Sequence, residues 1–185
     1  MDGDVRLRPV TEGDLEVVTR CLTDPDSLGE FQWTGWREAT HWRKRWAEDG
    51  LLGDDDGYLM IVLGHERLGL VTWRRNQTAP NSHCWTVGIS LVPQARGHGY
   101  GSRAQRQLVD YLFTHSPVQR IEAYSEEGNT PELVALEHAG FRREGVLRSH
   151  RFRAGAWRDT VVLSILRGEH RDGSDQETHP EPDAG

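Results

Sequence analysis

The sequence predicts an α/β domain built on a mixed β-sheet, and three observations lead to that fold class. Strand and helix patterns follow in the order strand, two helices, three strands, helix, strand, helix and two strands, which is typical of a sheet covered by helices. Short turns at Gly64-His65-Glu66 and Ala154-Gly155-Ala156 predict two antiparallel hairpins. A glycine-rich segment, Gln94–Gly101, joins a strand to a helix in mid-chain.

The first elements are predicted to be one strand and two helices. Apolar and polar residues alternate over Val5–Arg8, as in a half-buried strand. Thr11–Asp14 is a capping-box pattern that opens a helix to about Leu22. Ala39–Glu48 is predicted to form a second, short helix.

The remaining elements follow from hydrophobic periodicity and from the residues that stop each element. Asp54–Gly57 is a turn pattern before the first hairpin, and Gly140 is a C-terminal stop for the last helix. The predicted strands are Tyr58–Leu63, Arg67–Arg74, Cys84–Val92, Arg120–Tyr124, Gly145–Arg153 and Trp157–Leu166, and the predicted helices are Ser102–His115 and Thr130–Ala139.

Length and composition indicate one soluble globular domain, because the 185 residues are 36% hydrophobic and 28% charged. The net charge is −7, and residues 168–185 hold six acids and one arginine, which contribute −5 of it. The remaining chain is nearly neutral, so no nucleic-acid partner is expected. We therefore place the domain at residues 1–167 and a disordered, acidic tail at residues 168–185.

Three features predict a cytoplasmic protein with neither a membrane partner nor a metal. No apolar run reaches the roughly 20 residues of a membrane helix. Met1–Asp4 is acidic and lacks the core of a signal peptide. The two cysteines, Cys21 and Cys84, have no metal-like spacing, and a disulfide framework is not expected.

The Gln94–Gly101 segment is predicted to bind an anion, since a glycine-rich turn before a helix leaves backbone N–H groups unpaired at the positive end of the helix dipole. A nucleotide P-loop is disfavoured because Tyr100 and Gly101 follow Gly99 where Lys and Ser/Thr are needed. A dinucleotide fold is disfavoured because the turn lies mid-chain, after a hairpin. An acyl-CoA turn and an ordinary tight turn stay open.

Gln94-x-x-Gly97-x-Gly99 resembles the Q/R-x-x-G-x-G/A motif of the GNAT N-acetyltransferase superfamily. Asn129, followed by a helix that ends in Leu136–Phe141, resembles the second signature of that superfamily. Glu144–Arg148 and Trp157–Asp159 resemble segments of the Rim-type branch, the ribosomal-protein N-terminal acetyltransferases. The resemblance spans about residues 5–167 and implies the GNAT fold, a mostly antiparallel central sheet whose parallel central strands splay apart between flanking helices.

The resemblance implies an acetyl-CoA-dependent N-acetyltransferase, in which a primary amine attacks the thioester directly in a ternary complex. The acceptor would be a small molecule or a peptide N-terminus, and a homodimer is one expected state because many relatives are dimers. Two alternatives stay open: a non-catalytic acyl-CoA-binding module, and transfer of a different acyl group.

The same resemblance places the donor between the Cys84–Val92 and Arg120–Tyr124 strands, with its pyrophosphate on the N–H groups of residues 96–101. Glycines there suit close approach of phosphate oxygens. Arg96 is also interpretable as a solvated loop arginine, and Asn129 as a simple N-cap. The predicted donor-binding residues are Ile89, Leu91, Val92, Arg96, Gly97, His98, Gly99, Tyr100, Gly101 and Asn129.

The chain departs from the family at two catalytic positions. Leu136 stands where many members have a tyrosine, and Glu132 stands where Rim-type enzymes often have serine. Glu132 is predicted to act near the sulfur, or else to be a first-turn acid favoured by the helix dipole. Glu122 resembles the position of a general base in some relatives, but strand alternation leaves its direction open.

Pro25–Gly35 is predicted to be a loop on the acceptor side, as the resemblance implies. Its aromatic residues Phe31, Trp33 and Trp36 are predicted to line an acceptor pocket. Trp42 and Trp46 of the following helix are four residues apart and are predicted to face the core.

Overall fold

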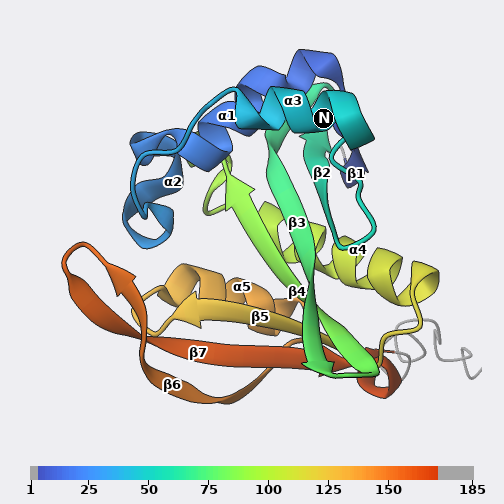
Figure 1. Ribbon diagram of the computed structural model, residues 1–185, viewed down its shortest axis with the longest axis vertical. Coiled ribbons are helices and arrows are strands. Elements are labelled where there is room, and N and C mark those ends of the chain that lie inside the picture. The colour runs from blue at the N-terminus through green and yellow to red at the C-terminus, as the bar shows by residue number, and fades with distance from the viewer. Residues whose placement is uncertain (1–3, 171–185) are drawn as a thin grey trace, which may run out of the picture.

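A seven-stranded mixed sheet forms the centre of the protein in the computed structural model, which describes residues 4–170 (Figure 1). The strand order is β1-β2-β3-β4-β5-β7-β6, and only β4 and β5 run parallel. The strands are β1 (Val5–Pro9), β2 (Asp56–Leu63), β3 (Glu66–Ala79), β4 (Ser82–Leu91), β5 (Arg120–Glu126), β6 (Arg142–Arg153) and β7 (Ala156–Leu166). The helices are α1 (Leu15–Thr23), α2 (Pro25–Gln32), α3 (His41–Asp49), α4 (Tyr100–His115) and α5 (Thr130–His138).

The two parallel strands separate after a short paired stretch, which confirms the predicted splay. They pair only at Trp85↔Ile121, Thr86↔Glu122 and Val87↔Ala123. Beyond these pairs β4 continues to Leu91 and β5 to Glu126 without pairing to each other. The ribbon therefore opens into a V, with β1–β4 in one arm and β5–β7 in the other (Figure 1).

The two faces of the sheet lie against different helices. Trp85 donates its indole N–H to Ser116 just beyond α4, whereas Ser90 donates its hydroxyl to a carbonyl of α1, that of Cys21. Odd-numbered residues of β4 thus face α4, and even-numbered residues face the side of α1. Thr86 of β4 is paired with Glu122 of β5, so even-numbered residues of the two strands share a face. Glu122 and Tyr124 therefore also lie on the side away from α4.

The structure corrects the predicted loop at Pro25–Gly35, because residues 25–32 form α2. Asp24 caps this helix by accepting a hydrogen bond from the Ser27 N–H at 2.9 Å, and Pro25 occupies the first turn, where proline is tolerated. Gly29 interrupts the helix with φ +68°. This glycine weakens the helical pattern in the sequence, which is the physical reason that the segment resembles a loop.

Other elements agree with the predictions in type and differ at their ends. The capping box at Thr11–Asp14 is present, and the short 3₁₀ turn Glu12–Asp14 precedes α1. Strand β3 extends to Ala79 because its polar end pairs with β4. Trp42 is buried, and Trp46 packs against the core while its indole donates to the Val10 carbonyl at 2.9 Å.

The predicted tail at residues 168–185 lies mostly outside the described residues. Its first residues are described and contact the domain. The Glu169 carboxylate pairs with Arg142 at 2.7 Å, and His170 lies 2.9 Å from Asp110.

The backbone of Gly69 determines how closely β3 approaches the end of β4. Gly69 has φ +149°, and a Cβ atom there would lie 2.1 Å from the Ser90 carbonyl oxygen. We expect Gly69→Ala to lower the free energy of unfolding by about 2–3 kcal/mol, because neither backbone can move without disturbing the strand pair. Urea denaturation measures the loss. Gly145→Ala is the control, since a Cβ there meets nothing within 4 Å; equal stability of the two variants would contradict the expectation.

Candidate functional site

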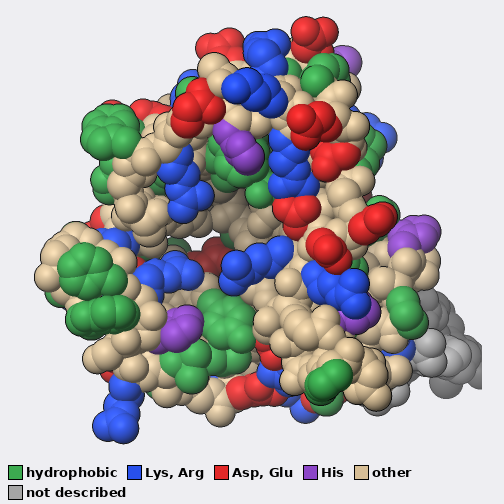
Figure 2. Space-filling model, in the orientation of Figure 1, with side chains coloured by type: hydrophobic (Ala, Val, Ile, Leu, Met, Phe, Trp, Pro, Cys, Tyr) green, Lys and Arg blue, Asp and Glu red, His purple; other side chains and the backbone are tan. Residues whose placement is uncertain are grey.

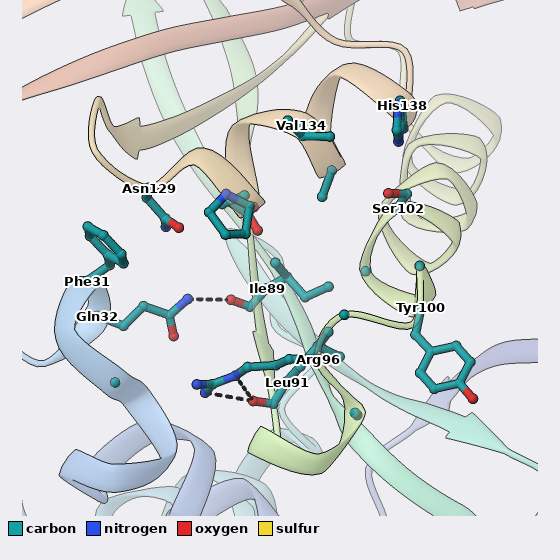
Figure 3. Close-up of a pocket in the computed structure, with 18 of the residues that line it drawn as sticks. Phe31, Gln32, Ile89, Leu91, Arg96, Tyr100, Ser102, Asn129, Val134 and His138 are labelled. Carbon is teal, nitrogen blue, oxygen red and sulfur yellow. Dashed lines mark hydrogen bonds between the residues drawn. The ribbon is translucent and has the colours of Figure 1, made fainter.

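A cavity of about 590 Å³ lies between four segments of the chain (Figure 3). Its walls are the end of α2, the end of β4, the Ala95–Gly101 turn with the start of α4, and α5 along its length. On the opposite face of the sheet, Figure 2 shows a hollow between the two arms of the V, with basic side chains at its rim. The splay of β4 from β5 therefore leaves space on both faces.

The glycine-rich turn presents the N-terminus of α4 to the cavity. Gly97 and Gly99 have φ of +77° and +72°, which favours glycine. A Cβ on either residue would meet nothing within 4 Å, so both face open space. The helix has no side-chain cap and no acid in its first turn. Its first N–H groups and its dipole therefore favour an anion at this end of the cavity.

Two side chains satisfy the carbonyl groups that β4 exposes after it leaves β5. Gln32 donates its Nε2 to the Ile89 oxygen at 2.8 Å. Arg96 donates its Nε and Nη2 to the Leu91 oxygen at 3.1 and 3.0 Å and also reaches the Ser27 carbonyl of α2. Figure 3 shows both side chains at the strand edge. The Arg96 guanidinium thus lines the cavity and is held by three backbone contacts, while the residue as a whole stays exposed.

The first turn of α5 contributes two polar side chains to the cavity. Asn129 lines it, and its side chain makes no capping hydrogen bond. Glu132 is half-buried beside it, and its carboxylate accepts a hydrogen bond from Gln105 Nε2 of α4 at 2.7 Å. Burial raises the pKa of Glu132 to about 7, against the opposing effect of Gln105. Glu132 is therefore placed to hold a proton near neutral pH.

Glu122 lies on the opposite face and does not line this cavity. Its carboxylate accepts hydrogen bonds from Arg120 Nε at 2.6 Å, from the Tyr124 hydroxyl at 2.8 Å and from Asn76 Nδ2 at 3.3 Å. Burial alone would raise the pKa of Glu122, but the hydrogen bonds from Arg120 and Tyr124 outweigh it, so the pKa is lowered. A carboxylate stabilised in this way is a weak proton acceptor, and its role as general base stays a prediction.

The setting of neighbouring Cys84 disfavours its thiolate form. Burial and the charge of Glu122 raise the pKa of its thiol to about 11, so the thiolate is scarce at neutral pH. Among the described residues, no group of three His, Cys, Asp or Glu is arranged to hold a metal ion. None of the described helices has the length and apolar character needed to cross a membrane.

Phe31 connects the two arms of the V. Its ring lies over the Arg153 guanidinium with 5.4 Å to the ring centroid, and Arg153 forms a buried, bidentate pair with Glu126 at 2.6 and 2.8 Å. Phe31 also lines the cavity. Trp33 and Trp36 do not line it; their rings pack edge to face 5.0 Å apart, and Trp36 is 84% exposed. Their acceptor role stays a prediction.

Most of the predicted donor-binding residues gather around the cavity. They are Ile89, Leu91, Arg96, Gly97, Gly99, Tyr100, Gly101 and Asn129. Val92 and His98 line a separate hollow of about 370 Å³ instead. For Val92 the cause is strand alternation, since it directly follows Leu91 and its side chain therefore lies on the opposite face of the sheet.

Sequence reasoning missed several residues of this site, among them Gln32 and His138, which line the cavity, and Gln105, which donates to Glu132 from outside it. Gln32 was missed because α2 was predicted to be a loop. Gln105 carried a readable signal, because it is a polar residue three positions before Leu108 on the buried face of α4. A buried polar side chain needs a partner, and the sequence does not show which one it has.

Comparisons of the sequence identify its relatives. The profile of the acetyltransferase (GNAT) domain matches residues 4–142. An uncharacterized N-acetyltransferase, p20 of Bacillus licheniformis, is 36% identical over 84 residues, so this match spans 45% of the chain and about half (47%) of that protein. The uncharacterized N-acetyltransferase YoaA of Bacillus subtilis is 31% identical and covers 87% of this chain and 92% of its own length.

Solved structures show the same fold. RimJ of Mycobacterium smegmatis, in complex with CoA-disulfide, has a TM-score of 0.74 at 28% identity and covers 94% of this chain and 90% of its own. Spermidine N-acetyltransferase of Vibrio cholerae, in complex with CoA and spermine, has a TM-score of 0.78 at 17% identity and covers 90% of this chain and 98% of its own. The second likeness concerns the fold alone.

The raised pKa of Glu132 makes stability depend on pH. The folded state holds this proton up to about pH 7, whereas an unperturbed carboxyl has a pKa of 4.5. The stabilisation is therefore complete when the pH is below the pKa of this carboxyl group in the unfolded chain. It is lost as the pH rises through the pKa of the same group in the folded protein. We expect the unfolding free energy of the wild type, relative to Glu132→Gln, to fall by about 2–3 kcal/mol between these two values. Urea denaturation at stepped pH measures the difference, and parallel curves for the two proteins would contradict it.

Proposed function

This chain belongs to the acetyltransferase (GNAT) family, and on that premise we propose that it transfers the acetyl group of acetyl-CoA to the primary amine of a small molecule or a peptide N-terminus. One observation carries the donor assignment. The open N-terminus of α4 and the β4 edge that no other strand covers line the same cavity. The cavity thus offers an anion site next to backbone carbonyl groups that can accept hydrogen bonds from amides. CoA has the matching pair of groups, a pyrophosphate for the anion site and an amide-bearing arm for the strand edge.

In the proposed complex, the N–H groups of residues 96–101 hold the pyrophosphate. The open space in front of Gly97 and Gly99 fits phosphate oxygens that a side chain would displace. The carbonyl groups of Ile89 and Leu91 accept hydrogen bonds from the pantetheine amides, and Asn129, whose side chain makes no capping bond, contacts the same arm.

The proposed chemistry needs a proton at the leaving sulfur. Acetyl-CoA supplies a thioester whose carbonyl carbon is open to attack. The amine nitrogen forms the new C–N bond, the C–S bond breaks, and Glu132 donates its proton to the departing thiolate. The amine releases one proton to solvent, and Glu132 recovers one from solvent, so the exchange is balanced. Glu132 suits this role because burial keeps it protonated near neutral pH.

In the proposed complex the acceptor approaches from the sheet face that carries Glu122, here called the acceptor face, and the charges there favour a peptide N-terminus over a polyamine. The acids there are already matched by arginines, with Glu122 and Glu144 on Arg120 and Glu126 on Arg153. A polycation that loses its hydration shell would find few unpaired carboxylates among the described residues of this face to compensate for the loss. A single ammonium or amine group does not need such a set of carboxylates. The 28% identity to RimJ also supports a Rim-type acceptor.

The glycine turn offers a direct test of the donor assignment. We expect Gly99→Val and Gly97→Val to weaken CoA binding by about 100-fold or more, because the new side chain enters the phosphate site. Isothermal titration calorimetry measures the affinity. Gly64→Val is the matched control: its φ is also left-handed at +59°, a Cβ there meets nothing within 4 Å, and it lies outside the cavity. Equal loss in all three variants would mean strain alone, and unchanged affinity would exclude this pyrophosphate site.

An acceptor panel tests the rest of the proposal. We expect thiol release from acetyl-CoA to be at least about 10-fold faster, in kcat/KM, with short peptides that have free N-termini than with spermidine, since the acceptor face has few unmatched acids. Peptides with acetylated N-termini are the blank. A preference for spermidine would overturn the peptide assignment. CoA binding without turnover for every amine would favour a non-catalytic acyl-CoA-binding module.

A further inference from the structure

Gln105 is a buried side chain with half of its hydrogen bonding missing. It lies on α4 and is 2% exposed. Its Nε2 donates to Glu132 at 2.7 Å, but its Oε1 has no hydrogen-bond partner among the described residues. A buried carbonyl oxygen without a donor is costly, by about 1–3 kcal/mol, and is rare in native proteins. The missing partner therefore needs an explanation.

Glu132 carries the missing donor when it is protonated. A neutral carboxyl group has one O–H donor besides its acceptor oxygens, and it can face an amide with two parallel hydrogen bonds. One runs from Gln105 Nε2 to Glu132, as observed, and the other runs from the Glu132 hydroxyl to Gln105 Oε1. If the oxygen and nitrogen of the Gln105 amide were exchanged, a protonated Glu132 would still be needed. The amide oxygen would then lie 2.7 Å from a Glu132 oxygen, and two oxygens at that distance require a proton between them.

The surroundings of Glu132 favour the neutral form. The charged or titratable groups that share the cavity are Glu30 of α2, Arg96 of the turn, Tyr100 of α4 and His138 of α5. None of them forms an ion pair with Glu132 among the described residues, and Arg96 is held by carbonyl groups. Burial, opposed only by Gln105, is what raises the pKa of Glu132.

We propose that Gln105 is a positioning residue that orients the neutral carboxyl group of Glu132 at the donor cavity, through a two-bond acid–amide pair. This inference rests on the proposed function, in which Glu132 is the acid. When the C–S bond breaks and the sulfur takes the proton, the Nε2 bond to Gln105 stabilises the carboxylate that remains. Proton uptake from solvent then restores the pair. Gln105 itself does not line the cavity, so it acts through Glu132 and not on the donor.

Infrared difference spectroscopy of the free protein tests the pair without any need for activity. We expect a protonated-carboxyl C=O band that is lost as the pH rises through about 7 and is absent in Glu132→Gln. In Gln105→Met the band moves to higher frequency, because the carboxyl group loses its partner. Gln107→Met is the matched control: Gln107 is also on α4 and donates to the Val5 carbonyl, outside the cavity. No titrating band, or a band unmoved by Gln105→Met, would overturn the proposal.

Kinetics then separate positioning from simple packing. With a peptide acceptor, we expect Gln105→Met to lower kcat about 10-fold with the KM for acetyl-CoA nearly unchanged, and Glu132→Gln to remove the alkaline fall in kcat. Gln107→Met keeps the wild-type kcat and pH profile. A Gln105→Met variant with wild-type kcat and pH profile would reduce the contact to a helix–helix bridge. If no amine is acetylated but the band behaves as expected, the pair stands and the proposed function fails.

Discussion

The separation of β4 from β5 is the constraint on which the rest of the structure depends. Three residue pairs hold the parallel strands together, and beyond them each strand has an edge without a partner. Backbone polar groups that are removed from water must find other partners, and here α2 and the glycine turn supply them through Gln32 and Arg96. The cavity, the position of α2 and the exposure of the α4 N-terminus all follow from this one break in the sheet.

Two glutamates near the break have opposite proton affinities because their surroundings differ. Glu122 accepts hydrogen bonds from Arg120 and Tyr124, so its charged form is stabilised. Glu132 has one amide donor and mostly apolar neighbours, so its neutral form is stabilised. Two carboxyl groups whose pKa values are shifted in opposite directions are a common means of dividing acid and base functions within one fold. Here the carboxyl group with the lowered pKa and the one with the raised pKa also lie on opposite faces of the sheet.

The sequence predicts the fold and the conformation of the glycine turn well because both are encoded locally. The left-handed φ at Gly97 and Gly99 requires glycine, so the turn is visible in the residues themselves. Helix α2 was missed because Gly29 interrupts its pattern. The face of Glu122 depends on its register with Thr86, and the partner of Gln105 is 27 residues away on another helix. Such contacts arise only from tertiary structure, and the site roles assigned to single residues stay predictions until they are tested.

The hydrogen bonds from Gln32 and Arg96 to β4 have a thermodynamic consequence. The Leu91 oxygen already accepts two hydrogen bonds from Arg96 in the protein alone, so in the proposed complex an incoming amide replaces a bond at Leu91 instead of adding one. Such an exchange is nearly neutral in free energy. In the proposed complex the strand edge selects the donor by the spacing of its amides, while the attraction comes mainly from the positive end of the α4 dipole. Residence of the donor should consequently shorten as ionic strength rises, because salt screens that charge and leaves the exchanged bonds unaffected.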